Sequence, residues 1–182
     1  MGFDIIGGMK LTLNKEFLYR HLFALAVFAC LGGWFGLDAF CRYPATPARD
    51  LYVAIDKAEP PEGMTQAQLE AFKAGKVRTQ RVLAGLVLLA AVATGLHLAA
   101  VASQKFSFDD EGFAVGSRRV PWSAKTEADA SRWESKRILR LRGDGWRTTL
   151  DAWHHNGVRE FYAKYCENNR SAGGHSIRCR CG

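Results

Sequence analysis

Residues 82–103 read VLAGLVLLAAVATGLHLAAVAS, an apolar stretch in which His97 is the only ionisable residue. The hydrocarbon core of a bilayer, about 30 Å thick, needs about 20 such residues in a helix. Arg81 and Lys105 flank the stretch. Within lipid the backbone must satisfy its own hydrogen bonds, which favours a helix. Residues 82–103 therefore predict a transmembrane helix.

A second apolar stretch, LFALAVFACLGGWFGLDAF, predicts another membrane-spanning helix over residues 21–41. Its only charge is Asp38, four residues before Arg42, so the two side chains can pair on one helix face. Two alternatives remain open: buried helices of a soluble protein, and a cleaved signal peptide at the first stretch. Neither stretch has the polar face of a soluble helix, and no small-residue cleavage site follows the first one.

Small residues in both stretches predict close helix packing, because they let backbones approach where lipid removes the hydrophobic drive between helices. Depth matching in an antiparallel hairpin brings Gly32 near Ala90 or Ala91, and Gly36 near Gly85. The rest of the stripe on the second helix then faces bulky side chains or a second copy of the chain, so a homodimer is one expectation. The predicted packing residues are Gly32, Gly36, Gly85, Ala91, Gly95 and Ala99.

The segments around the first stretch are expected to differ in order. Residues 1–20 are expected to form an N-terminal tail. Several prolines in residues 42–64 predict an irregular extracytoplasmic loop. Residues 65–81 consist of good helix formers, and Thr65 with Gln68 fits a capping box. We therefore expect one helix that begins in this segment and runs into the second span.

Residues 104–168 predict a small antiparallel β domain. FSF and FAV flank the turn sequence DDEG, and SKRILRLR alternates so that Leu139 and Leu141 point inward. Apolar residues at helical spacing from Val158 to Tyr165 predict a final helix. The expected fold class is α+β, with a two-helix transmembrane hairpin and a small antiparallel β domain closed by a C-terminal helix.

The order of motifs in this domain resembles a known family. EGF at residues 111–113 and VPW at residues 120–122 are followed by a charged strand, a hairpin and a final helix. This order is similar to that of small bacterial pleckstrin-homology-like (PH-like) domains. Two spans followed by such a domain resemble uncharacterised bacterial membrane proteins with a cytoplasmic PH-like module. The resemblance implies binding or scaffolding and carries no catalytic residues, although fold alone does not establish function.

The chain carries a formal net charge of +7, and part of the basic excess lies in the predicted β domain. A basic surface beside a membrane is attracted to anionic lipid headgroups. Nucleic acid also binds basic patches in general, but the leaflet is nearer, so we expect no nucleic-acid partner. The residues predicted to contact an anionic surface are Arg118, Arg119, Arg137, Arg140 and Arg142.

Few residues suggest chemistry. Asp151, His154 and His155 are close in sequence and are of the types used in acid–base catalysis, but no motif places a nucleophile near them. A proton-relay or ligand role for His97 is a further hypothesis, because ionisable groups inside a membrane are functional candidates. We expect no enzyme activity, no cofactor, no metal and no small-molecule substrate.

The C-terminal residues 169–182 predict a disordered tail. Cys179 and Cys181, with His175, offer too few ligands for a metal site by themselves. The chain has five cysteines without the spacing of a disulfide scaffold, which favours a reducing compartment for the C-terminal side. Basic residues do not settle the orientation. We expect a plasma (inner) membrane protein with both termini in the cytoplasm.

The predicted function is an integral membrane anchor that presents a cytoplasmic PH-like binding or scaffolding domain. Its expected partners are the lipid bilayer and a protein partner or a second copy. The alternative is an accessory subunit of a membrane transport or secretion assembly.

Overall fold

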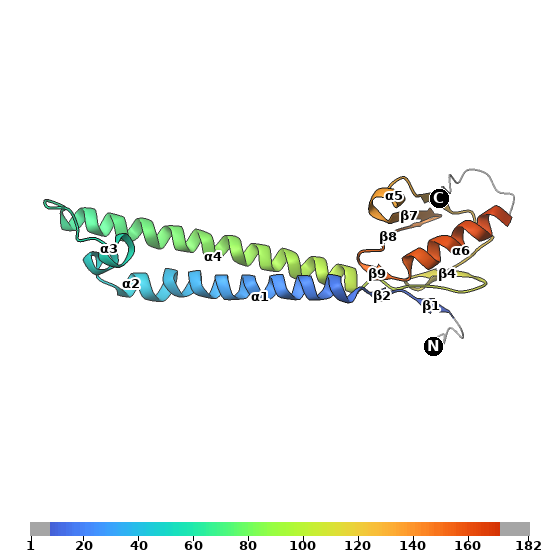
Figure 1. Ribbon diagram of the computed structural model, residues 1–182, viewed down its shortest axis with the longest axis horizontal. Helices are drawn as coiled ribbons and strands as arrows, with labels where there is room; N and C mark the ends of the chain where they lie inside the picture. Colours follow the sequence, from blue (N-terminus) through green and yellow to red (C-terminus); the bar gives the residue numbers. More distant parts are fainter. Residues whose placement is uncertain (1–7, 172–182) are drawn as a thin grey trace. The chain divides into compact units, whose positions relative to one another are not determined.

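The computed structural model describes residues 8–171 and has an α+β fold (Figure 1). The chain divides into two compact units. The helical unit comprises residues 20–98. The β unit combines residues 1–19 with residues 99–182, of which residues 8–19 and 99–171 are described.

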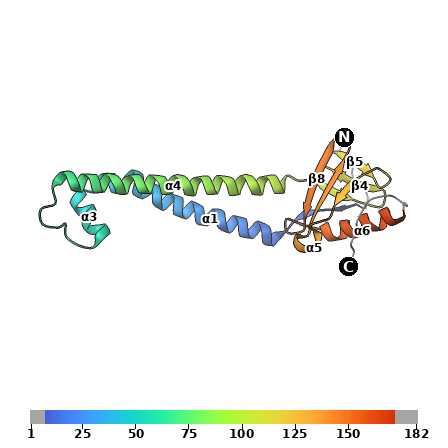
Figure 2. The same ribbon diagram turned by 90° about the horizontal axis from the view of Figure 1, so that it is seen from above.

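Two long apolar helices dominate the helical unit and lie side by side (Figures 1 and 2). The first is α1 (Lys15–Leu37), which continues through the π-helix η1 (Asp38–Arg42) and the short α2 (Tyr43–Ala45). The second is α4 (Gln66–Ala102). Both are long and apolar enough to cross a membrane, at 31 residues for Lys15–Ala45 and 37 for Gln66–Ala102. The two predicted helices are therefore present.

The beginning of α4 confirms the predicted capping box. The Thr65 backbone N–H donates to the Gln68 side-chain oxygen at 2.7 Å, and the Gln68 N–H reaches the Thr65 hydroxyl at 3.4 Å. These contacts satisfy two backbone donors that a helix start leaves without an internal partner. From there α4 runs without interruption into the apolar stretch, as predicted.

The predicted Asp38–Arg42 pair is also present, within η1. The Arg42 Nη1 atom lies 3.3 Å from the Asp38 Oδ1 atom. Asp38 is buried, whereas Arg42 is exposed. A buried carboxylate requires a partner of this kind, because the loss of hydration is otherwise too costly.

The segment between the long helices differs from the predicted irregular loop 42–64. It contains α3 (Ala48–Asp56), whose Ala48 and Leu51 are buried and whose Tyr52 ring lies 4.8 Å from that of Phe72. Pro47 occupies the N-cap position of α3. Proline is tolerated at the start of a helix, because its missing N–H would have no internal partner there. The prolines therefore separate helical segments and do not prevent them.

Helix packing differs from the predicted small-residue contacts. A Cβ atom on Gly32 would meet the Val87 side chain at 3.5 Å, which lies one turn away from the predicted Ala90 and Ala91. A Cβ atom on Gly36, Gly85 or Gly95 would meet nothing within 4 Å among the described residues. The rings of His21 and His97 lie 5.6 Å apart between the two helices. His97 therefore faces the neighbouring helix.

The β unit contains antiparallel sheets and two further helices. Its strands pair in the orders β1-β3-β4-β5, β2-β9 and β6-β7-β8. The short α5 precedes β7, and α6 follows the last strand. The elements are β1 (Met9–Lys10), β2 (Thr12–Leu13), β3 (Phe106–Phe108), β4 (Gly112–Val115), β5 (Arg118–Pro121), β6 (Glu127–Asp129), α5 (Trp133–Lys136), β7 (Ile138–Gly143), β8 (Trp146–Asp151), β9 (His155–Asn156) and α6 (Val158–Ser171).

The prediction of a separate N-terminal tail over residues 1–20 is wrong, because part of this segment forms two of these strands. In β1, Met9 pairs with Phe108, and in β2, Leu13 pairs with His155. The β unit therefore extends beyond the predicted 104–168. Strands of two residues show no alternation that a sequence pattern could detect.

The core of the β unit lies between α6 and the sheets. Phe161 of α6 contacts the Phe106, Phe108 and Phe113 rings, at centroid distances of 4.8, 5.4 and 5.5 Å. The Trp133 ring packs 4.2 Å from Tyr162. The predicted apolar face of the final helix and the inward positions of Leu139 and Leu141 are confirmed by their burial. The fully buried large residues of the unit are Phe17, Phe113, Leu139, Leu141, Leu150, Val158, Phe161 and Tyr165.

Candidate functional site

The outer face of the β6-β7-β8 sheet carries charged side chains from all three strands. Successive residues of a strand point to opposite faces. The inward positions of Leu139 and Leu141 therefore send Arg140 and Arg142 outward. In the sheet register, Arg140 lies opposite Asp129 of β6, and Arg142 lies opposite Arg147 of β8. Charged groups from three strands thus share one face.

These residues line an open hollow of about 1040 Å³. Arg142 and Arg147 are exposed and make no ion pair with any described residue. Arg140 lies 3.9 Å from a carboxylate oxygen of Asp129, so its charge is partly balanced. We call this site the arginine hollow, and its polar and charged lining includes Gln104, Glu127, Asp129, Arg140, Arg142, Arg147 and Thr149.

The five arginines predicted to contact an anionic surface differ in their contacts, and three of them do not line the arginine hollow. Arg119 lies 2.6 Å from a carboxylate oxygen of Asp109, and it also pairs with Glu111 at 3.5 Å. Arg118 donates to the backbone carbonyl of Asp144 at 2.6 Å and links the start of β5 to the turn between β7 and β8. Both guanidinium groups therefore have partners within the β unit.

Arg137 lies 3.6 Å from a carboxylate oxygen of Glu134, and its guanidinium lies 5.7 Å from the centre of the Trp133 ring. It is the C-cap residue of α5 and is not among the paired residues of β7 and β8 that line the arginine hollow. Of the five predicted residues, only Arg140 and Arg142 line the hollow.

Arg147 is a candidate that the sequence reasoning missed. The signal was present, because the turn between β7 and β8 pairs Gly143 with Trp146 and therefore places Arg147 opposite Arg142. Counting outward from the predicted hairpin turn would have found this cross-strand pair. The outward face thus has one more cation than the sequence analysis assigned to it.

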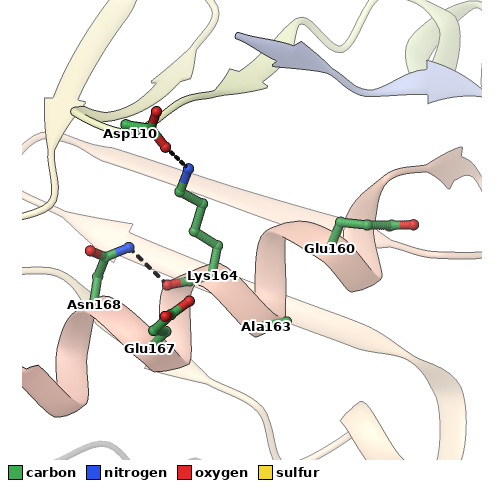
Figure 3. Close-up of a pocket in the computed structure, with 6 residues that line it drawn as sticks. All are labelled: Asp110, Glu160, Ala163, Lys164, Glu167 and Asn168. Atoms are coloured by element: carbon green, nitrogen blue, oxygen red, sulfur yellow. Dashed lines mark hydrogen bonds and ion pairs between the residues drawn. The ribbon is translucent and has the colours of Figure 1, made fainter.

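A second hollow, of about 540 Å³, lies along α6 (Figure 3). It is lined by the carboxylates of Asp110, Glu160 and Glu167 and by the amine of Lys164. Figure 3 shows Lys164 extended toward Asp110, with which it forms an ion pair. This amine is already paired, and no other cation is present among the described lining residues.

The candidate acid–base residues Asp151, His154 and His155 have structural partners. The Asp151 carboxylate accepts the Trp153 N–H at 2.8 Å. The His154 ring lies 4.6 Å from that of Phe17, and its Nε2 atom lies 4.0 Å from Asp151. These contacts link the chain after β8 to the beginning of α1, within the β unit.

His155 is 4% exposed, and its Nε2 atom lies 3.3 Å from the carbonyl oxygen of Val101 in the last turn of α4. A carbonyl only accepts, so Nε2 carries the proton and donates. In the neutral ring Nδ1 is then an acceptor, and it has no hydrogen-bond partner among the described residues. Burial lowers the pKa of His155 from its usual 6.5, against the opposing effects of the Val101 hydrogen bond and of Asp151. The neutral His155 ring therefore makes the hydrogen bond that holds the end of α4.

Because its folded pKa lies below its unfolded pKa, His155 binds a proton more readily in the unfolded chain. The stability that neutral His155 contributes is fully present above the unfolded pKa. It is lost as the pH falls from about 6.5 toward the folded pKa. We expect the thermal unfolding midpoint of the full chain in detergent to fall more between pH 8 and pH 5.5 than that of His155→Gln. Equal pH dependence in the two proteins would contradict this assignment.

Among residues 8–171, no group of three His, Cys, Asp or Glu side chains is placed to hold a metal ion. The predicted disordered tail, residues 169–182, is wrong for residues 169–171, because they continue α6. Residues 172–182, with the hypothesised ligands His175, Cys179 and Cys181, lie outside the described residues. No protein-family model matches the chain, and no curated protein or solved structure matches it either.

Proposed function

We propose that the chain is an integral membrane protein whose two long helices anchor a non-catalytic PH-like domain for binding or scaffolding. The domain is the β unit, and both chain termini are placed in the cytoplasm. The membrane is the plasma (inner) membrane of a bacterium, as the resemblance of the sequence implies.

The observation that carries this proposal is the apolar surface of the helical unit. Large apolar side chains stand exposed around α1 and α4, with Phe23 at 72%, Leu88 at 64% and Leu96 at 67%. None of the most apolar window of α4 is buried inside the protein. Soluble monomers rarely expose contiguous apolar patches of this extent. Lipid chains would cover such a surface at no hydrophobic cost.

Support for a PH-like domain comes from the arrangement of the β unit. Two antiparallel sheets are closed by the C-terminal helix α6, which packs its apolar face on them. The EGF and VPW motifs of the resemblance lie at the paired strands β4 and β5, where Phe113 and Val120 are opposite one another in the core. These motifs thus contribute to packing in the core of the domain.

The membrane proposal predicts that the full chain stays in the membrane pellet after alkaline carbonate washing. Replacing Leu88 and Leu89 together with arginine should cost about 5–7 kcal/mol of insertion free energy and release the second span. The control carries two arginines at exposed positions of the β unit, Ser117→Arg with Ser135→Arg, and should remain in the pellet. Recovery of the wild-type chain in the wash would contradict integral insertion.

Orientation requires an exposed thiol in the β unit. Cys166, the natural candidate, is only 2% exposed and would be protected from a reagent on either side of the membrane. Ser117, in the exposed turn between β4 and β5, is the position at which a cysteine would report the side. Greater labelling of Ser117→Cys than of the wild type, in which Cys30 and Cys41 are also exposed, in sealed, right-side-out cells would contradict the cytoplasmic placement.

The second candidate function is an accessory subunit of a transport or secretion assembly. It is favoured by the space beside Gly36, Gly85 and Gly95, which no described residue occupies within 4 Å of an added Cβ atom. Small residues of this kind let another helix approach closely. Replacing Gly95 and Ala99 with leucine separates the two functions. Loss of a defined membrane complex on a native gel would favour the subunit, and an unchanged complex would favour the anchor.

A further inference from the structure

The arginine hollow contains two cations that form no ion pair with any residue among 8–171. Arg142 and Arg147 are direct cross-strand neighbours on the outer face of the sheet. Like charges in this position destabilise a sheet. Glu127 lies opposite Arg142 on the other side, but no ion pair joins them among the described residues. An anion placed between the two guanidinium groups would remove the repulsion.

Polar groups around these arginines add further donors. The hydroxyl-bearing Thr149 lies opposite Arg140 in the register, and the Gln104 side chain also lines the hollow. Arginine binds phosphate through paired N–H donors in a fixed planar fork, which makes it well suited to such a group. Hydroxyl and amide groups beside it can complete the hydrogen bonds of the phosphate oxygens.

The carboxylates of Asp129 and Glu127 restrict the charge of the ligand. They lie on β6, along one side of the hollow, and Asp129 already balances part of the Arg140 charge. The face therefore has only a small net positive charge. Such a site favours a singly charged phosphodiester over a phosphate monoester or a polyphosphate, which would meet repulsion from the carboxylates.

The position of Gln104 indicates where this phosphodiester would come from. Gln104 follows the end of α4 at Ala102 by two residues, so its backbone lies within about 8 Å of the helix end. If α4 spans the bilayer, this wall of the hollow lies at the level of the lipid headgroups. Each basic group at that level increases the affinity for anionic lipids by about tenfold or less.

We infer that the arginine hollow binds the phosphodiester headgroup of an anionic phospholipid in the leaflet from which α4 emerges. Arg142 and Arg147 hold the phosphate between them, and Thr149 and Gln104 donate to its oxygens. This inference rests on the proposed membrane function, and it adds a lipid class and a defined site to it. It also gives the unpaired arginines of the sheet a partner.

The test uses the full chain in a zwitterionic detergent, titrated with short-chain phosphatidylglycerol, phosphatidylcholine of the same chain length, or inorganic phosphate. Binding is followed by isothermal titration calorimetry. We expect phosphatidylglycerol to bind at least tenfold more tightly than phosphatidylcholine. The double variant Arg142→Gln with Arg147→Gln should weaken phosphatidylglycerol binding by about tenfold to thirtyfold and leave phosphatidylcholine unchanged.

Two variants serve as controls. Lys125→Gln with Arg159→Gln removes the same charge at exposed positions outside the hollow and should keep phosphatidylglycerol affinity within about twofold. Arg142→Lys with Arg147→Lys keeps the charge but loses the planar fork, so it should fall between the wild type and the glutamine variant. The glutamine variant should also unfold at an unchanged or higher temperature without lipid, because the repulsion between the arginines is gone.

Three outcomes would overturn the inference. The first is equal loss of affinity in both glutamine double variants, which would indicate a general charge effect. The second is inorganic phosphate binding as tightly as phosphatidylglycerol, which would indicate a soluble anion. The third is no preference between the two lipids. A chain that resists carbonate washing yet shows this third result keeps its membrane function and loses only the lipid site.

Discussion

Replacing Phe161 with alanine is expected to lower the free energy of unfolding of the β unit by about 3–5 kcal/mol. The ring is fully buried on α6, and it contacts Phe106, Phe108 and Phe113 from the adjoining sheet. Its removal leaves a cavity among rings that cannot all move into it, so both transfer energy and packing contacts are lost. A small domain has only about 5–15 kcal/mol of stability in total.

The thiol of Cys166 gives the measurement, because it lies on the same helix and is almost fully buried. Its labelling by a thiol reagent at increasing denaturant, read by mass spectrometry of the peptide, reports opening of the domain in the full chain. Arg159→Ala, an exposed change on α6, is the control and should shift the transition by less than about 0.5 kcal/mol. Similar transitions for Phe161→Ala and Arg159→Ala would show that the ring is not packed as described.

Composition and local pattern predicted the parts of this fold that depend on neighbouring residues. The two apolar stretches form helices because their length and uniform hydrophobicity admit few other structures. The Thr65–Gln68 contact was readable because a capping box spans only four residues. Likewise, the alternation around Leu139 and Leu141 predicted which side chains of β7 point inward.

The parts that the sequence did not predict depend on residues far apart in the chain. Strands β1 and β2 form only because they pair with the strands that contain Phe108 and His155. Those strands lie about a hundred residues or more further along the chain. Helix α3 was missed because prolines were interpreted as breakers, although Pro47 stands where a helix can begin. Helix packing at Gly32 depends on the relative rotation of two helices, which depth matching does not determine.

The candidate site shows the same division. The sequence predicted that Arg140 and Arg142 point outward, because that depends on one strand alone. It did not predict that Arg119 is committed to Asp109, since that contact joins β5 to the turn before β4. Although burial of Asp109 opposes it, hydrogen bonds from Arg119 and from two backbone N–H groups lower the pKa of this carboxyl. Which arginines remain available is therefore decided by tertiary contacts.

Replacing Gly112 with alanine is expected to cost about 3 kcal/mol, because no side chain fits between β4 and β5 at this position. A Cβ atom on Gly112 would lie 2.2 Å from the Val120 carbonyl oxygen and 2.8 Å from the Pro121 Cα atom. Both contacts are with backbone, so the two strands would have to separate. The Gly112 N–H also donates to Asp109 at 3.1 Å, and movement of the strand would weaken that turn.

Gly116→Ala is the matched control in the next turn of the same sheet. Gly116 has a φ of +64° but open space around it, so alanine there meets only the left-handed backbone strain of about 1–2 kcal/mol. The denaturant dependence of Cys166 labelling should therefore shift more for Gly112→Ala than for Gly116→Ala. The reverse order would mean that backbone conformation, and not the close approach of β4 to β5, limits this hairpin. In that case Gly112 would not be required for the close approach of the two strands, and the left-handed conformation at Gly116 would be the stronger constraint.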